Sequence, residues 1–290
     1  MAGRAVKVPR SIALFTHATV EDASGGVTTL VDAALEAGLE VRVPAVEAKK
    51  HGLDERPGLV VRDEPSSDTD LAVVLGGDGT ILTALRACAA YDLPVFAINY
   101  GAIGFLSTVD HGEVEDGIRR ILSGDFDTLA IPALEIHIDG GARLAVNDVS
   151  FHRRPDDRVA ELAYLVEGEE LGRVRCDGLV ASTPVGSTGY NLANGGPVLA
   201  WGVDGYVVSF IAPHTLTARA LVVDTETVLQ VENRSRRHPV DVHADGRIVS
   251  ALEPGERVEM RFRHDRVLIA QVSGSSFYAR LREKFGRLAY

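Results

Sequence analysis

Residues 71–82 read LAVVLGGDGTIL, and this stretch decides the fold. The apolar run 71–75 predicts a buried strand. The glycine turn 76–80 follows it, and the segment from Ile81 to about Ala90 predicts a helix. Strand, glycine turn and helix in this order are typical of open parallel sheets, which bind ligands at the carboxyl ends of their strands.

The unusual residue of this turn is Asp78. Glycines let backbone N–H groups approach a phosphate, and a helix N-terminus adds a favourable dipole. A carboxylate repels phosphate, so Asp78 either holds Mg²⁺ or accepts a proton from an attacking hydroxyl. A tight turn capped by Asp78 is the structural alternative. The turn also lacks the Lys-Ser/Thr ending of a P-loop, so it must bind phosphate differently.

Composition excludes several classes of function. The chain has 290 residues, of which 46% are hydrophobic and 24% charged, and this predicts one large or two ordinary globular domains. Its net charge of −11 argues against a nucleic-acid partner. It has no signal peptide and no 18-residue apolar run, so we expect neither secretion nor a membrane partner. Cys88 and Cys176 predict reduced thiols and a cytoplasmic protein.

The first part of the chain alternates between strands and helices. We expect a doubly wound parallel sheet there, with the polar segment 46–69 as a surface excursion. The expected strands are 11–17, 40–44, 71–75 and 94–99, and the expected helices are 27–39, 81–90 and 113–122.

From residue 129 onward, short period-2 stretches predict a mainly β, sandwich-like domain. A short helix is expected near Ser187, and the basic tail 277–285 is helical or extended. We therefore expect an α/β domain over 1–125, a β-rich domain over 126–272 and a tail over 273–290 that packs back on the first domain. The expected site lies in the cleft between the two domains.

Polar segments of the β-rich part are further candidates. Asn147-Asp148 is either a turn or a pair of side chains that hold a ribose and a base. In the segment 175–197, Ser187 predicts a helix N-cap, and Ser187, Thr188 and Tyr190 can line a polar pocket. We interpret His214 as a structural hydrogen-bonding residue and 243–247 as a hairpin turn. No His or Cys cluster has zinc spacing, so no protein-held metal site is predicted.

Together these segments resemble the NAD kinase family over residues 70 to 285. After the glycine turn come NYGAIGFLS at 99–107, VND at 146–148, CDGLVASTPVGSTGYNLANGGPV at 176–198, APHTLTARALVV at 212–223 and HADGR at 243–247. The resemblance implies an α/β domain and a β-rich domain that bind the nucleotide. It implies phosphoryl transfer from ATP or polyphosphate to the adenosine ribose 2′-hydroxyl of NAD, with Mg²⁺ or another divalent cation. It also implies a homodimer or homotetramer.

The resemblance implies a role for individual residues. Asp78 corresponds to the general base, and Gly79 is its backbone neighbour at the ribose. Asn147, Asp148 and Tyr190 correspond to NAD contacts, with Tyr190 as the aromatic member of the adenosine segment. The further positions implied in nucleotide binding are Gly77, Thr80, Arg158, Arg175, Asp177, Ser187, Thr188, Gly189, Ala193, Ala212 and Arg247.

Some residues depart from the family pattern. Val185 replaces a threonine, Gly189 replaces an alanine, and Thr83 stands where many members have arginine. These departures leave open the choice of donor and the affinity for NAD. The choice between NAD and NADH as acceptor is open as well. Two alternatives to NAD phosphorylation are a lipid kinase with the same Gly-Gly-Asp-Gly turn and a non-catalytic NAD(P)-binding sensor. The absence of a basic docking stretch weighs against the first, and the intact Asp78 against the second.

Overall fold

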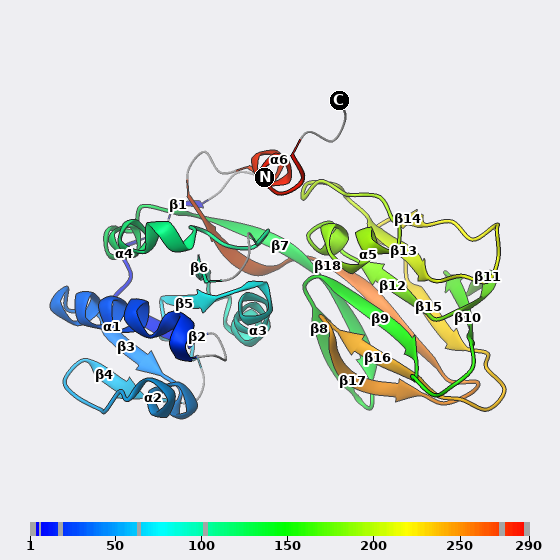
Figure 1. The fold of residues 1–290 in the computed structure, drawn as a ribbon, viewed down its shortest axis with the longest axis horizontal. Helices are drawn as coiled ribbons and strands as arrows, with labels where there is room; N and C mark the ends of the chain where they lie inside the picture. Colours follow the sequence, from blue (N-terminus) through cyan, green and yellow to red (C-terminus); the bar gives the residue numbers. More distant parts are fainter. Residues whose placement is uncertain are drawn as a thin grey trace. The chain divides into compact units, whose positions relative to one another are not determined.

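The computed structural model describes residues 4–5, 7–16, 20–62, 65–100, 104–272 and 276–286. The chain forms two units: one comprises residues 1–131 and 266–290, and the other comprises 132–265. The chain passes from one unit to the other within β7 (Asp127–Ile138) and again within β18 (Arg257–Gln271). Figure 1 labels the elements of each unit.

The first unit is built on a parallel sheet. Its strands lie in the order β6, β5, β2, β3, β4, and every pair among them is parallel. The chain runs outward from β2 through β3 and β4, and then returns to the other side of β2. Such a reversal of strand order marks the usual ligand site of an open sheet, and Gly76 ends β5 there. The bounds are β2 (Ser11–Thr16), β3 (Glu40–Val43), β4 (Leu59–Val61), β5 (Leu71–Gly76) and β6 (Val95–Asn99).

Helices cover both faces of this sheet. Val73 and Leu75 of β5 share one apolar cluster with Leu30 of α1 and Ile121 of α4. Because alternate residues of a strand point to opposite faces, Ala72 and Val74 face the other side, and α3 packs against β5, β6 and β2. The expected doubly wound sheet is confirmed. The helices of this unit are α1 (Val20–Glu36), α2 (Ala45–His51), α3 (Asp78–Cys88), α4 (Val114–Ser123) and α6 (Phe277–Phe285), and the two-residue strand β1 (Arg4–Ala5) pairs with β7.

The expected surface excursion over 46–69 is wrong, because this segment contains α2 and β4. The helix is short and polar. Glu47 lies in its first turn, Lys49 and Lys50 lie in its last turn, and Gly52 ends it in the left-handed conformation. Similarly, α1 begins at Val20 rather than at residue 27, because Gly25 and Gly26 interrupt the apolar pattern by which its first turns could be predicted. His17, the last residue of the first expected strand, lies outside the described residues.

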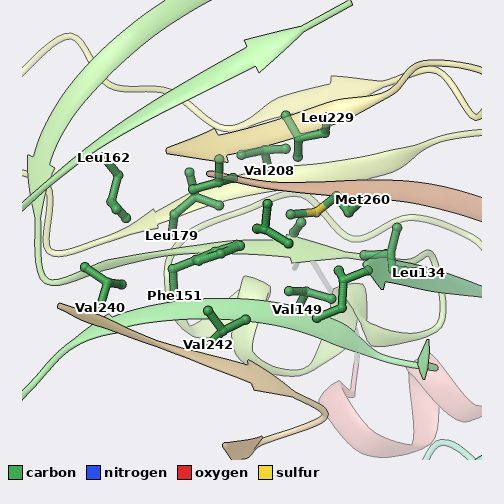
Figure 2. Close-up of a cluster of buried hydrophobic side chains, with 14 of the residues drawn as sticks. Leu134, Val149, Phe151, Leu162, Leu179, Val208, Leu229, Val240, Val242 and Met260 are labelled. Atoms are coloured by element: carbon green, nitrogen blue, oxygen red, sulfur yellow. The ribbon is translucent and has the colours of Figure 1, made fainter. Parts of the chain in front are cut away.

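The second unit is a sandwich of antiparallel strands, as expected. One sheet has the order β14, β13, β12, β9, β16, β17. The strands β11, β10, β15 and β18 are neighbours in the other sheet, and side chains of both sheets share one core. Figure 2 shows side chains from these strands in one apolar core, among them Phe151, Leu162, Leu179 and Met260. The bounds are β8 (Gly141–Ala145), β9 (Asp148–Arg153), β10 (Ala160–Val166), β11 (Glu169–Cys176), β12 (Gly178–Ser182), β13 (Tyr206–Ile211), β14 (Leu221–Val223), β15 (Leu229–Asn233), β16 (Val240–Ala244), β17 (Arg247–Leu252) and the helix α5 (Tyr190–Ala193).

The core of the second unit yields a stability prediction. Phe151 has no exposed surface, whereas 92% of Leu216 is exposed. Phe151→Ala leaves a cavity, so we expect it to lower the free energy of unfolding by about 3–5 kcal/mol. Leu216→Ala, the control, should change it by less than about 0.5 kcal/mol. Urea unfolding followed by circular dichroism measures both, and equal midpoints for the two variants would contradict the assigned core.

Candidate active site

The glycine turn places Asp78 at the N-terminus of α3, the helix that Figure 1 labels beside β5 and β6. Gly77 is the N-cap with extended backbone, and Asp78 is the first helical residue. A Cβ atom at Gly76 would lie 2.7 Å from Oγ1 of Thr80, so the missing side chain lets Thr80 pack over the end of β5. The helix dipole is favourable for a carboxylate in this first turn.

The carboxylate of Asp78 contacts the segment that follows β6. Its Oδ2 accepts the backbone N–H of Phe105 at 3.4 Å. A Cβ atom at Gly104 would lie 2.3 Å from Oδ1, so only glycine leaves room for the carboxylate. Oδ1 is buried and has no hydrogen-bond partner in the described part of the chain. A buried acceptor without a partner is costly, and a substrate hydroxyl or a cation would satisfy it.

A charged side chain of the C-terminal helix α6 holds the peptide group of Phe105 that contacts Asp78. Arg280 of α6 donates to the carbonyl oxygen of Phe105 at 2.5 Å and to Oε1 of Gln271 at 2.9 Å. The backbone of Phe105 therefore joins Arg280 to Asp78. Burial lowers the pKa of Arg280, and the charges of Asp110 and Asp78 oppose that shift. The sequence analysis quotes Gly104 and Phe105 within the NYGAIGFLS motif but gives them no role of their own. It misses Arg280, because nothing in the tail distinguishes Arg280 from its basic neighbours.

In the second unit, the polar segments lie on the adjacent strands β12, β9 and β16. Asp148 on β9 lies opposite Ser182 on β12, and Ala244 on β16 lies opposite Val149. The next turn approaches still more closely, since a Cβ atom at Gly186 would lie 2.1 Å from the carbonyl oxygen of Asn147. The sheet thus brings together 146–148, 182–188 and 243–247, which are far apart in the sequence.

Asp245 holds the segment that carries the candidate NAD contacts. Its carboxylate accepts the backbone N–H groups of Val146, Asn147 and Asp148 at 3.1, 2.7 and 3.3 Å. Asp245 and Gly246 have φ angles of 47° and 73°, which is typical of a tight hairpin turn. The hairpin expected over 243–247 is therefore confirmed. Sequence analysis missed that its aspartate also positions Asn147 and Asp148.

An aromatic cluster lies beside these residues. The rings of His152 and Tyr190 stack with centroids 5.5 Å apart and planes inclined by 6°, and His243 meets the edge of His152 at 4.6 Å. Burial, and then the charge of His243, lower the pKa of His152 to about 4, so His152 is neutral at pH 7. Tyr190 is 37% exposed and presents ring surface to a ligand. Sequence analysis missed His152, because the two histidines come from different strands.

Asp148 is the buried acid of this group. Burial, with the charge of Asp245 as the second cause, raises the pKa of Asp148 to about 7. Burial raises the pKa of Tyr190, and the charges of Asp148 and Asp177 add to that shift, which places these groups near one another. Oδ1 of Asn147 is buried and has no hydrogen-bond partner among the described residues. The group can therefore both donate and accept hydrogen bonds to a nucleoside.

Two other predicted residues have partners within the protein. Asp177 forms an ion pair with Arg153 at 2.6 Å, which holds the pKa of Asp177 below its usual range. Ser187 has no exposed surface, and its hydroxyl donates to the carbonyl oxygen of Pro184 and accepts the N–H of Leu199. The expected N-cap role of Ser187 is therefore wrong. Ser187 instead lies inside a 3₁₀ turn (Gly186–Thr188) and fastens it to residue 199.

The other predicted residues line a cavity of the second unit or lie at element ends and turns. Arg158 and Arg175 line a cavity of about 490 Å³ that neither Asp148 nor Tyr190 lines. The remaining predicted positions are exposed or half-buried at element ends and turns: Gly77, Gly79, Thr80, Thr188, Gly189, Ala193, Ala212 and Arg247. His214 is exposed, and its backbone N–H donates to the carbonyl oxygen of Arg175. Residues 101–103 of the NYGAIGFLS motif lie outside the described residues.

The described residues contain no group of three or more His, Cys, Asp or Glu side chains placed to hold a metal ion. Among the same residues, no helix is both long and apolar enough to span a membrane. Cys88 and Cys176 are buried and free, and burial raises the pKa of both thiols to about 12.

Comparison with known proteins decides the family. The ATP-NAD kinase N-terminal domain model matches residues 5–126, and the C-terminal domain model matches residues 146–271. A protein named NAD kinase from Gemmatimonas aurantiaca is 33% identical over 248 residues, which cover 83% of this chain and 85% of that protein. This chain belongs to the NAD kinase family. A relative named NAD kinase from Paraburkholderia phymatum is 33% identical over 280 residues, covering 95% of this chain and 93% of its own.

Solved structures show that the NAD kinase fold extends over nearly the whole chain. A yeast NADH kinase complexed with NADH matches with a TM-score of 0.84 and 24% identity, covering 98% of this chain and 89% of that chain. An NAD kinase from Archaeoglobus fulgidus in complex with ATP matches with a TM-score of 0.71 and 23% identity, covering 95% and 97%. At this identity the two structures establish the shared fold alone.

The raised pKa of Asp148 predicts how stability depends on pH in this NAD kinase family member. The folded chain binds a proton at Asp148 up to about pH 7, whereas the unfolded chain releases it near pH 4. Ionisation of Asp148 therefore opposes folding increasingly as pH rises through this window. Asp148→Asn cannot ionise, so its free energy of unfolding should rise relative to the wild type between pH 4 and 7.

Urea unfolding at pH 4, 5, 6 and 7 measures this difference. Asp156→Asn is the control, because Asp156 is exposed in a neighbouring turn of the same unit. Its pH profile should run parallel to that of the wild type. A parallel profile for Asp148→Asn as well would contradict the raised pKa.

Proposed function

We propose that this protein transfers the terminal phosphoryl group of ATP to the 2′-hydroxyl of the adenosine ribose of NAD. The γ-phosphorus–oxygen bond of ATP breaks, a bond from the ribose oxygen to that phosphorus forms, and the hydroxyl loses its proton. The products are NADP and ADP. As a member of the family the protein is an NAD kinase, a phosphotransferase with an alcohol group as acceptor. The observation that carries the site is the buried Oδ1 of Asp78 at the start of α3, which has no hydrogen-bond partner among the described residues.

Asp78 accepts the proton of the attacking hydroxyl. A ribose hydroxyl is a weak nucleophile, so phosphoryl transfer needs a well-placed acceptor and alignment of the attacking and leaving oxygens. Oδ2 is held by the N–H of Phe105, and Arg280 holds the same peptide group from its carbonyl side. This leaves Oδ1 for the hydroxyl. The exposed start of α3 at Gly79 supplies backbone N–H groups for the phosphates.

The group around Asp148 binds the nucleoside part of NAD. The ring of Tyr190, stacked on neutral His152, offers an apolar face to a base. Asn147 contributes a side-chain carbonyl oxygen that has no partner among the described residues. Asp148 contributes a carboxyl that donates a hydrogen bond when protonated and accepts when ionised. Asp245 positions both residues through their backbone N–H groups.

The described residues contain no group of three metal-ligating side chains, which suits a Mg²⁺ ion that a nucleotide holds for the most part. In such sites Mg²⁺ is bound through one or two carboxylates together with substrate phosphates, so a three-residue protein cluster is not required. Asp78 is the carboxylate of the glycine turn that would hold it. When bound, Mg²⁺ neutralises charge on the transferred phosphoryl group. In this proposal Asp78 accepts the proton and would also be the protein's contact to the cation, and inorganic polyphosphate is the alternative donor.

We further propose a cytoplasmic homodimer or homotetramer. Two free, buried cysteines suit a reducing compartment. Strand β17 lies at one edge of the six-stranded sheet with Ile248 66% exposed, and β14 lies at the other edge with Leu221 and Val222 exposed. Open edges with apolar side chains favour pairing between chains. Light scattering measures the assembly.

The two alternative functions find no support. The matched family models and relatives are NAD kinases, which favours neither a lipid kinase nor a non-catalytic sensor. One assay separates the three functions. The protein is incubated with Mg²⁺, a phosphoryl donor and either NAD or diacylglycerol. NADP is then measured with an NADP-specific dehydrogenase and phosphatidic acid by chromatography: the first product indicates an NAD kinase, the second a lipid kinase, and neither product a non-catalytic sensor.

Asp78→Asn tests the role of the carboxylate. The amide keeps the shape but cannot take a proton, so turnover should fall by about 10²–10⁴-fold. NAD affinity, measured by calorimetry, should stay within a few-fold of the wild type. Asp92→Asn, an exposed position of the same unit, is the control and should keep full turnover. Turnover of Asp78→Asn near the wild-type value would sink the proposal that Asp78 is the base.

Gly104→Ala tests the position of the carboxylate rather than its chemistry. The new Cβ atom would lie 2.3 Å from Oδ1 of Asp78, so the carboxylate must move. A displacement of this size should lower turnover by about 100-fold. The control is Gly112→Ala, because a Cβ atom there meets nothing within 4 Å. If the two alanine variants had the same turnover, Gly104 would have no role in placing Asp78.

A further inference from the structure

The C-terminal helix α6 directs three side chains at one residue of the first unit, Phe105. Arg280 donates to the carbonyl oxygen of Phe105 at 2.5 Å. One turn further along the helix, the ammonium group of Lys284 lies over the Phe105 ring, 4.5 Å from its centroid. The ring of Phe285 lies 5.8 Å from the same ring, centroid to centroid. The helix therefore holds both the backbone and the side chain of Phe105.

The helix is itself fixed to the rest of this unit. Leu281 is 8% exposed and anchors α6 by its apolar side chain. At the start of the helix, Oγ of Ser276 accepts the N–H of Ala279 at 3.1 Å and so caps the first turn. Arg280 also donates to Oε1 of Gln271, the last residue of β18, at 2.9 Å. Because a guanidinium group carries its donors in a rigid plane, Arg280 holds its two acceptors in a fixed geometry.

Phe105 transmits this constraint to Asp78. Its backbone N–H donates to Oδ2 of Asp78 at 3.4 Å, which is long for a hydrogen bond, so a small shift of Phe105 would break it. The preceding residue, Gly104, lies so close to Oδ1 that a Cβ atom there would be 2.3 Å away. The segment 104–105 thus limits where both oxygens of the carboxylate can lie, and α6 limits where this segment can lie.

We propose that α6 positions the catalytic carboxylate, with Arg280 as its principal positioning residue. This inference rests on the proposed function, because it assigns the helix a role in the same phosphoryl transfer. Arg280 acts through the peptide group of Phe105 and not on the reacting atoms. Its loss should therefore lower kcat and leave the KM for NAD unchanged, since Asp148 and Tyr190 belong to the other unit. A residue that merely attached α6 would affect stability and not the turnover of the folded protein.

Steady-state kinetics of Arg280→Ala tests this role. A displacement of the carboxylate by about 1 Å should lower kcat by about 100-fold, with a KM for NAD within a few-fold of the wild type. Arg282→Ala is the matched control, because Arg282 is exposed on the same helix. It removes the same charge and should keep the wild-type kcat.

Rescue by added guanidinium separates positioning from attachment. A cavity of about 140 Å³ adjoins the site, and Gly104, Arg280 and the carboxylates of Asp110 and Glu283 are among its lining residues, so a small cation can enter it. Millimolar guanidinium chloride should restore part of the kcat of Arg280→Ala. Methylammonium chloride carries the same charge without the planar donors and should restore less. Neither salt should restore Asp78→Asn, which lacks the carboxylate.

A second variant tests the ring contacts and serves if circular dichroism shows that Arg280→Ala does not fold. Lys284→Gln/Phe285→Leu weakens the contacts to the Phe105 ring and leaves Arg280 in place. Both residues are exposed, so the variant should fold. Its kcat should fall by about three- to tenfold with the KM for NAD unchanged, because the displacement is smaller than in Arg280→Ala.

Two results would overturn the inference while the proposed function stands. One is a wild-type kcat in folded Arg280→Ala or, where that variant does not fold, in Lys284→Gln/Phe285→Leu. The other is a loss of kcat in Arg280→Ala that guanidinium leaves unchanged. If the wild type itself forms no NADP, the proposed function fails, and this inference fails with it.

Discussion

One constraint organises the first unit: a carboxylate is held at the end of a buried strand, and one of its oxygens has no hydrogen-bond partner in the described part of the chain. Leaving a buried acceptor without a partner costs about 1–3 kcal/mol, so the surrounding structure must offset that cost. The all-apolar strand β5, packed between helices on both faces, supplies the rigidity. Gly104 supplies the space, and the N–H of Phe105 fixes the other oxygen. Asp78 is therefore set up to meet a ligand rather than a neighbouring side chain.

In the second unit, too, rigid backbone holds the polar groups in place, but there the backbone is that of adjacent β-strands. Adjacent strands carry its polar groups, and Asp245 uses its carboxylate to hold the backbone of 146–148. Gly186 lets the following turn lie against Asn147. The buried acid Asp148 then has a pKa of about 7, which makes its hydrogen-bonding role sensitive to physiological pH. Rigid strands position these side chains, and the exposed ring of Tyr190 stacks on His152 beside them.

The sequence predicts the parts that depend on local patterns. The run before Gly76 has the periodicity of a buried strand, and the alternating stretches after residue 129 predict the sandwich, so the fold class is correct. Short polar elements such as α2 escape prediction, because their stability comes from packing and caps rather than from an apolar stripe. Arg280, His152 and Asp245 escape prediction for another reason. Arg280 meets Phe105 from 175 residues away, His152 meets His243 from 91 and Asp245 meets Val146 from 99, and only the folded backbone brings these pairs together.

A crystal structure of the wild-type protein with NAD and a non-hydrolysable ATP analogue tests the central claim most directly. The account predicts Oδ1 of Asp78 within about 2.6–3.2 Å of the adenosine ribose 2′-oxygen. It also predicts Tyr190 and Asp148 against the nucleoside. A complex in which Asp78 binds only a cation, while a different group meets the 2′-hydroxyl, would contradict the assignment of Asp78 as the proton acceptor.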